Sequence, residues 1–276
     1  MSLLDMQRVF SRLLTDPYFQ REFFAEGADR PPGYDLTERE LDSLRRMDRK
    51  RLRLHAGNLA HARLGLALKS TPLSALVLHT QLDRHLVRFC REYPPIPVAE
   101  SAVILATTRL CEFAEKLFAE GELQPAYAWD LLRYEKHLLV QGFGVASCAS
   151  AAEFAHRTTP QGSFGDHVPI TGPHVLVDHF RHDLTALLPR LQSGDVPEHV
   201  SPLAEPVRIL FVKRPLKALV QTCRLNVAME SVWRRCDGVR TVDEIASAYP
   251  DPRPVVEALR ALHRFGAIAL TTGRTC

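Results

Sequence analysis

Apolar residues recur at helical spacing through the first half of the chain, with charged residues between them. In the first segment, Leu3, Met6 and Phe10 fall on one face, at the intervals of three and four that an amphipathic helix repeats. The same kind of pattern covers residues 3–24, 37–47, 49–69, 72–89, 98–120 and 125–142. The pattern therefore predicts a helical domain over residues 1–145.

The pattern changes after residue 142. Residues 143–172 are dominated by Gly, Ser, Thr, Pro and His, a composition typical of a long loop. His174–Phe180 then alternates apolar with polar residues, which predicts a strand, and residues 184–191 predict a short helix. We therefore expect residues 146–206 to form an irregular linker that contains one strand and one short helix.

The C-terminal segment combines strands with three short helices. Two apolar runs, residues 207–213 and 216–223, predict a pair of strands joined at Arg214-Pro215. Helices are expected over residues 227–236, from Thr241 onward and over 252–265, with a last short strand at 268–270. This order predicts a winged helix with a small antiparallel sheet over residues 207–276. The fold class is then α+β, with a helical domain followed by a winged-helix domain.

Short local signals mark where several of these helices begin and end. Thr37 with Glu40, and Thr241 with Glu244, have the spacing of a capping box, in which the two residues satisfy each other's free backbone N–H groups. Gly266 follows the last helical pattern and predicts its C-terminal end.

Composition and charge narrow the class of protein. The 276 residues are 46% hydrophobic and 24% charged, which is ordinary for a globular protein. A formal net charge of +3 is too small to indicate nucleic acid or an anionic membrane as a partner. The N-terminus lacks the pattern of a signal peptide, and the six cysteines lie far apart without a C-x-x-C pair. We expect a reduced, cytoplasmic protein.

Known catalytic and metal-binding patterns do not stand out. The chain has no P-loop, no Gly-rich dinucleotide motif and no Ser-His-Asp set. His174, His179 and His182 lie close together in the sequence, yet their spacing does not match a site of two histidines and one carboxylate. The sequence thus predicts no catalytic residue, no metal ligand and no cofactor held by this chain.

The C-terminal segment resembles the PqqD-like domains, also called RiPP recognition elements, which bind ribosomally made and later modified peptides. The resemblance rests on Arg224-Leu225-Asn226, Trp233, Arg235-Cys236-Asp237-Gly238, Thr241-Val242, Glu244-Ile245 and the end Leu259…Leu262…Gly266-Ala267-Ile268. Large apolar members of this set, Trp233, Leu225 and Ile245, are expected in the core. They mark the fold and are not expected to touch a peptide.

The resemblance implies a groove for a peptide that adds as a strand beside the third helix. An open sheet edge offers unpaired N–H and C=O groups to such a peptide. We place the groove along residues 216–223 and the exposed face of 255–264. The predicted peptide-binding residues are Leu216, Ala218, Val220, Thr222, Val255, Leu259, Arg260 and His263.

The N-terminal half resembles the TglI-like partner proteins of multinuclear non-heme iron oxidases. The matching stretches are LLTDPYFQREFF (13–24) and YDLTERELDSLRRMDRKRLRLHAGNL (34–59). The later segment HFRHDLTALLPRLQSG (179–194) resembles the region that such partners place before their peptide-binding domain. This resemblance implies a non-catalytic subunit whose helical domain binds a TglH-like oxidase. The subunit would present the C-terminal cysteine of a ribosomal carrier peptide, as in 3-thiaglutamate biosynthesis. Iron is expected in the partner enzyme and not in this chain.

Two other functions fit the same pattern. A winged helix can bind duplex DNA, and the helical half would then be an effector or dimerisation domain. The predicted third helix, however, has few of the Asn, Gln, Ser and Lys side chains that usually contact bases and phosphates. A PqqD-like chaperone that serves a radical enzyme or another tailoring enzyme would share the peptide site and differ in its partner.

Overall fold

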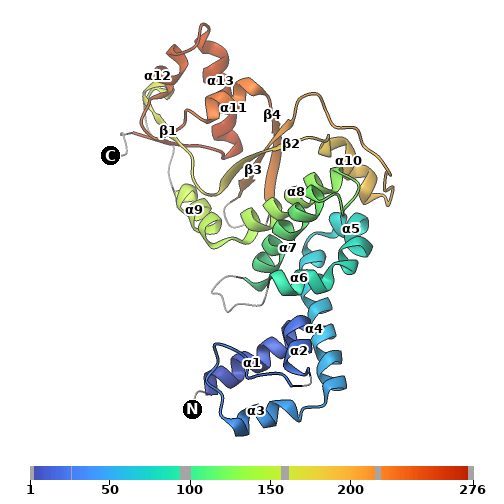
Figure 1. Ribbon diagram of the computed structural model, residues 1–276. Coiled ribbons are helices and arrows are strands. Elements are labelled where there is room, and N and C mark those ends of the chain that lie inside the picture. The colour runs from blue at the N-terminus through green and yellow to red at the C-terminus, as the bar shows by residue number, and fades with distance from the viewer. Residues whose placement is uncertain (1–2, 26, 94–100, 157–161, 215–218, 273–276) are drawn as a thin grey trace. The chain divides into compact units, whose positions relative to one another are not determined.

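The computed structural model describes residues 3–25, 27–93, 101–156, 162–214 and 219–272 (Figure 1). The chain forms two compact units, Met1–Gln124 and Pro125–Cys276. The first is helical, and the second combines helices with small antiparallel sheets. The predicted α+β class is therefore confirmed. The helix that follows Pro125 belongs to the second unit, whereas the sequence pattern grouped it with the N-terminal helices.

Helices alone make up the described part of the first unit. They are α1 (Leu3–Thr15), α2 (Pro17–Phe23), α3 (Glu38–Arg45), α4 (Arg49–Ser70), α5 (Pro72–Arg84), α6 (Leu86–Glu92) and α7 (Ala102–Ala119). The capping box of Thr37 and Glu40 is present at the start of α3, and the Asp48 side chain accepts from two backbone N–H groups at the start of α4. The single helix expected over residues 72–89 is two helices, although no Gly or Pro marks the break.

The second unit interleaves helices and short strands. It contains α8 (Tyr127–Phe143), α9 (Val145–His156), the 3₁₀ turn η1 (Phe164–Asp166), β1 (Val168–Ile170), β2 (Val175–Phe180), α10 (Leu184–Gln192), β3 (Val207–Lys213), β4 (Val220–Leu225), α11 (Val227–Trp233), α12 (Val242–Ser247), α13 (Pro252–Phe265) and β5 (Ala269–Thr271). The loop expected over residues 143–172 is wrong in its first part, because α9 lies there. Its alanine-rich sequence favours a helix.

Segments that are far apart in the sequence form the sheets. The order β2-β3-β4 makes a three-stranded antiparallel sheet, and β1 pairs with β5 across about a hundred residues. The backbone N–H of Val242 also donates to the carbonyl of His167. Residues 163–180, which the sequence assigned to a linker, are therefore strands and turns of the same unit as α11–α13.

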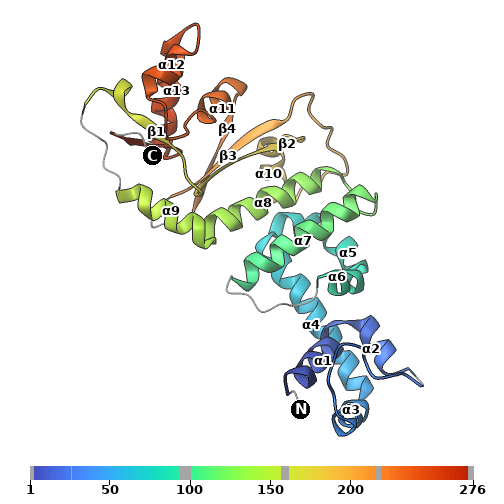
Figure 2. The ribbon, with the colours of Figure 1, turned by 60° about the vertical axis from the view of Figure 1, so that its left-hand side comes forward.

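Helices cover both faces of the three-stranded sheet, as Figure 2 shows with α8 below it and α11–α13 above. Leu210 and Val212 of β3 face the α11–α13 layer and belong to its core. Phe211 faces α8, where its ring centroid lies 5.5 Å from that of Tyr134. Both faces of β3 are thus buried, which explains the apolar run over residues 209–212.

The expected core residues of the C-terminal segment are largely confirmed. Leu225 and Ile245 are buried at 2% and 0% exposure, whereas Trp233 is half-buried and packs against the edge of that core. Gly266 ends α13 with a positive φ of 80°, a backbone conformation that glycine adopts without strain. Among the helices described, none combines the length and the apolar run that crossing a membrane requires.

Candidate functional site

The outer edge of β4 is the first candidate surface. Among the described residues, no backbone hydrogen bond joins this edge to a further strand. The backbone N–H of Arg214 donates to the carbonyl of Leu219, 3.4 Å away, so this opposed pair is hydrogen-bonded. Bonded and non-bonded pairs alternate along an antiparallel ladder. Val220, Thr222 and Arg224 therefore direct their backbone N–H and C=O groups outward, where another strand could pair.

The side chains of β4 alternate between the two helical layers. Opposed residues of an antiparallel pair share one face of the sheet. Thr222 lies opposite Phe211, on the α8 face, and Cys223 lies opposite Leu210, on the α11–α13 face. Burial raises the pKa of the Cys223 thiol, which stays protonated at neutral pH. The predicted Val220 and Thr222 thus contribute outward backbone groups, while their side chains share the face that α8 covers.

The predicted residues of α13 separate into two kinds. Val255 and Leu259 are exposed by only 5% and 0% and belong to the core, so they do not line a surface. Sequence spacing alone could not separate them from groove residues, because apolar residues at helical spacing suit a groove as well as a core. Arg260 and His263 do reach the surface. Two other predicted residues lie outside the described part of the chain: Leu216 and Ala218.

A hollow of about 370 Å³ brings Arg260 and His263 together; we call it the α13 hollow. It is lined by Phe164, Glu257, Arg260, His263 and Arg264. The Arg260 guanidinium lies 5.1 Å from the centre of the Phe164 ring and donates to Glu257 at 2.9 Å. The sequence did not indicate the role of Phe164, which reaches this hollow from η1, about a hundred residues before α13.

The side of α13 that faces the start of β4 is not the side that carries the α13 hollow. The Phe265 ring lies 5.8 Å from the guanidinium of Arg214, which donates to the Gln221 side chain at 2.6 Å. Ala258, Ala261 and Phe265 share one helical face at spacings of three and four. The α13 hollow opens on another face of the helix. The sequence placed the groove between residues 216–223 and Arg260. In the structure, the face of α13 beside β4 carries Phe265 instead of Arg260.

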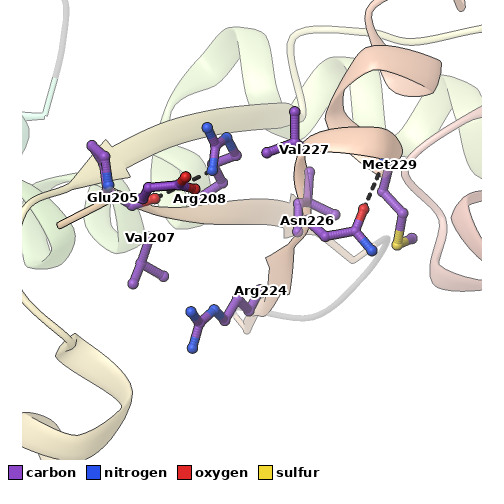
Figure 3. A pocket seen from close by; sticks show the side chains of 9 residues that line it. Glu205, Val207, Arg208, Arg224, Asn226, Val227 and Met229 are labelled. Atoms are coloured by element: carbon purple, nitrogen blue, oxygen red, sulfur yellow. Dashed lines mark hydrogen bonds between the residues drawn. The ribbon is translucent and has the colours of Figure 1, made fainter. Parts of the chain in front are cut away.

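A second hollow, of about 380 Å³, lies at the C-terminal end of β4 (Figure 3); we call it the β4 hollow. Its lining residues are Glu205, Pro206, Val207, Arg208, Arg224, Leu225, Asn226, Val227 and Met229. Arg208 and Arg224 extend from opposite faces of the strand pair, as the register requires. A strand added to β4 would end at this hollow. Sequence reasoning treated 224–226 as fold markers and missed it.

A charged cluster supports the β4 hollow from the α11 side. Glu230 is buried and lies 2.8 Å from Arg208 Nε, 2.6 Å from Arg234 and 3.1 Å from His179. Burial alone would raise the pKa of Glu230, but the hydrogen bonds with His179 and Arg234 hold it below its ordinary value. Arg208 is thus fixed by an ionised partner, whereas Arg224 is exposed.

A second cluster joins α8 to β2. Asp178 accepts from Arg133 at 2.5 Å and lies 2.6 Å from His137 Nε2. Burial opposes its ionisation, but the hydrogen bonds from His137 and from the His179 backbone, with the charge of Arg133, hold the pKa of Asp178 below its ordinary value. The ionised carboxylate therefore ties the sheet to its covering helix.

The cluster around Asp178 makes the free energy of unfolding depend on pH in the acidic range. A carboxyl whose folded-state pKa is depressed stabilises the fold above its unfolded pKa, and this contribution is lost as the pH falls through the folded value. We expect the free energy of unfolding to drop below about pH 4. Asp178→Asn should be less stable at pH 7 and should show a shallower drop, as measured by urea unfolding across this range. Parallel pH curves for the two proteins would contradict the role of Asp178.

The histidines considered as metal ligands have separate partners. His174 Nδ1 lies 2.9 Å from the Ser150 hydroxyl, His182 Nδ1 lies 2.8 Å from Asp130, and His179 faces the carboxylate of α11. Burial lowers the pKa of His174, against the Gly266 carbonyl that raises it. Within the described ranges, no three such side chains gather as a metal ion would require.

Comparison with known protein families and with curated proteins finds no match for this chain. The site is therefore defined by its own geometry. An exposed strand edge, where three residues direct their backbone groups outward, runs to a hollow that contains the exposed Arg224, and one face of α13 borders the start of that strand. Such an arrangement suits an extended chain better than a compact small molecule.

Proposed function

We propose that the unit Pro125–Cys276 binds an extended peptide as an added strand along β4. The observation that carries this proposal is the outward direction of the backbone groups of Val220, Thr222 and Arg224. Main-chain hydrogen bonds would give affinity, and pockets for alternate side chains would give selectivity. At the β4 hollow, the exposed Arg224 would pair with an acidic side chain of the peptide, since Arg208 is already held by Glu230.

The order of elements supports a PqqD-like, winged-helix identity for this unit. The strands β2, β3 and β4 are followed by α11, α12 and α13, and β5 supplies a wing. With the resemblance of the N-terminal half, we infer a non-catalytic, TglI-like subunit of a heterodimer. It would present the C-terminal cysteine of a ribosomal carrier peptide to a TglH-like iron oxidase, in RiPP biosynthesis such as that of 3-thiaglutamate.

Co-purification tests this assignment. The chain is produced with an affinity tag, together with a TglH-like iron oxidase. A stoichiometric complex that contains iron, and that turns over a cysteine-ended carrier peptide only when both proteins are present, is expected. Turnover by this chain alone, or the absence of any complex, would contradict the assignment.

Two charge reversals separate the two candidate surfaces. We expect Arg224→Glu to weaken carrier-peptide binding about three- to tenfold, because an exposed ion pair contributes ~0.2–1 kcal/mol and the reversed charge adds a repulsion of about the same size. Arg260→Glu, at the α13 hollow, should change the affinity less than about twofold. Titration calorimetry measures both. Arg253→Glu, an exposed position on α13 outside both hollows, is the matched control.

The opposite result, a loss with Arg260→Glu and none with Arg224→Glu, would move the peptide to the α13 hollow. That hollow contains Arg260 and His263, two of the groove residues predicted from the sequence.

A DNA-binding regulator is the second candidate. Arg253, Arg260 and Arg264 are exposed on one side of α13, the helix that a winged helix inserts into the major groove. Arg260, however, is paired with Glu257 at 2.9 Å. Duplex affinity that falls steeply with salt would favour this function. A PqqD-like chaperone for another tailoring enzyme would bind the peptide equally well and would co-purify with a different partner.

A further inference from the structure

Two arginines of the first unit lie against one exposed tyrosine ring. The guanidinium carbon of Arg21, on α2, lies 4.6 Å from the centre of the Tyr18 ring, and that of Arg91, on α6, lies 4.7 Å from it. All three side chains are exposed; we call them the Tyr18 cluster. They lie within Met1–Gln124, whereas the peptide site lies in the other unit.

Two helices build the Tyr18 cluster. Tyr18 and Arg21 are three residues apart on α2 and share one face of it, while α6, which packs against α2, supplies Arg91. Val87, exposed at 46%, lies one turn before Arg91 on the same side of α6. An aromatic ring, an aliphatic side chain and two cations therefore share this surface. Tyr and Arg are among the residue types that most often carry the binding energy of protein interfaces.

The two cations of the Tyr18 cluster are not neutralised. Within the ranges that the structure describes, neither Arg21 nor Arg91 forms an ion pair. The carboxylates nearest to them in the sequence have other partners or none: Asp16 pairs with Arg12, Glu92 pairs with Arg88 and Lys116, and Glu22 forms no ion pair in the same ranges. The ring attracts each guanidinium but does not cancel its charge, so the surface stays positive.

The donors of the Tyr18 cluster also lack acceptors. Among the described residues, the Tyr18 hydroxyl and the two guanidinium groups make no hydrogen bond. A phenolic hydroxyl can donate one hydrogen bond, and a guanidinium presents a planar fork of N–H donors that matches a carboxylate. The cluster therefore has the chemistry to hold an acidic side chain from outside this chain.

We propose that the first unit uses the Tyr18 cluster to bind an acidic segment of its partner enzyme, an inference that rests on the proposed assembly with a TglH-like oxidase. A carboxylate of the partner would accept from Arg21, Arg91 and the Tyr18 hydroxyl. Val87 and the ring would supply apolar contact beside it. Opposite charges across an interface speed the encounter and select the partner.

A nucleic acid is the other polyanion to consider at this surface. Nucleic-acid sites follow a phosphate backbone with a series of cations. The next arginine of α6, Arg88, is already paired with Glu92 and Glu120. Two cations beside an exposed tyrosine therefore suit one or two carboxylates of a protein better than a run of phosphates.

Biolayer interferometry of the full chain with a TglH-like iron oxidase, at low and high salt, tests this proposal. We expect the double variant Arg21→Glu, Arg91→Glu to bind the oxidase at least about tenfold more weakly. Much of the loss should lie in the association rate, and salt should weaken the unchanged chain more than the double variant, because salt screens the attraction that the variant lacks. Tyr18→Phe keeps the ring, removes only the hydroxyl donor and should cost about threefold.

Arg39→Glu is the matched control. Arg39 is an exposed arginine of α3 that forms no ion pair in the described part of the chain, and its reversal should change the oxidase affinity less than about twofold. Circular dichroism should show the same helical content for the double variant and for this control. The affinity for a cysteine-ended peptide should stay unchanged in both, because that site lies in the second unit.

The contrary outcomes are distinct. If the double variant bound the oxidase with the affinity and salt dependence of the unchanged chain, this inference would fail and the proposed assembly would stand. If the unchanged chain bound no oxidase, both would fail. Binding of a single-stranded DNA oligonucleotide that the double variant loses, with oxidase binding intact, would overturn the inference and assign the Tyr18 cluster to nucleic acid.

Discussion

Replacing Thr222 by proline is expected to weaken carrier-peptide binding at least about tenfold, since a main-chain hydrogen bond contributes ~0.5–1.5 kcal/mol and the proline ring also blocks the incoming strand. Thr222 directs its backbone N–H away from β3. The substitution therefore removes a donor for the peptide and leaves the ladder with β3 intact. Titration calorimetry gives the affinity, and circular dichroism checks the fold.

The neighbouring positions provide the controls. Thr222→Ala keeps the backbone donor, so its affinity should stay within about threefold of that of the unchanged chain. Gln221→Pro removes a donor that the ladder uses and should destabilise the sheet itself. A Thr222→Pro variant that binds the peptide normally would show that the peptide does not pair with β4.

Phe211→Ala is expected to lower the free energy of unfolding by about 3–5 kcal/mol, the usual cost of deleting a fully buried aromatic side chain. Phe211 is 0% exposed. Its ring centroid lies 5.3 Å from that of His137, 5.5 Å from that of Tyr134 and 6.2 Å from that of Phe180. Urea unfolding of the full chain measures the change.

This result would also test whether α8 packs against the sheet. Leu219→Ala, at a leucine that is 69% exposed, is the control and should change stability by less than about 0.5 kcal/mol. A loss below about 1 kcal/mol for Phe211→Ala would mean that α8 does not cover β3.

Local signals in the sequence predicted helix ends and strands well. The capping boxes at Thr37 and Thr241 are both present, because each needs only a hydroxyl and a carboxylate three residues apart. The strand predicted over 207–213 has the same bounds in the structure, and Gly266 ends α13 as expected. Such features depend on neighbouring residues, so a single sequence contains them.

The sequence did not indicate which strands, far apart along the chain, pair with each other. The strand at His174–Phe180 was predicted, but its partner β3 lies beyond α10 and a further connection. The pairing of β1 with β5 had no signal, because β1 is three residues long and follows a Gly- and Ser-rich stretch. Short strands gain their stability from tertiary packing, which the local pattern does not contain.

The candidate site shows the same division. Alternation along β4 indicated Val220 and Thr222, whose backbone groups do point outward. On α13, apolar spacing selected Val255 and Leu259, which are core residues. The β4 hollow was missed because Arg208 and Arg224 come from different strands, and only the register brings them to one end of the sheet.

Amide exchange measured by NMR, with and without a cysteine-ended peptide, tests the central proposal most directly. If the peptide adds as a strand, the backbone N–H groups of Val220, Thr222 and Arg224 should exchange more slowly in the complex, because only they gain a partner at the open edge. Gln221 and Cys223 already donate to β3 and should change little. A peptide that binds while the exchange of the three outward amides stays unchanged would contradict strand addition at β4.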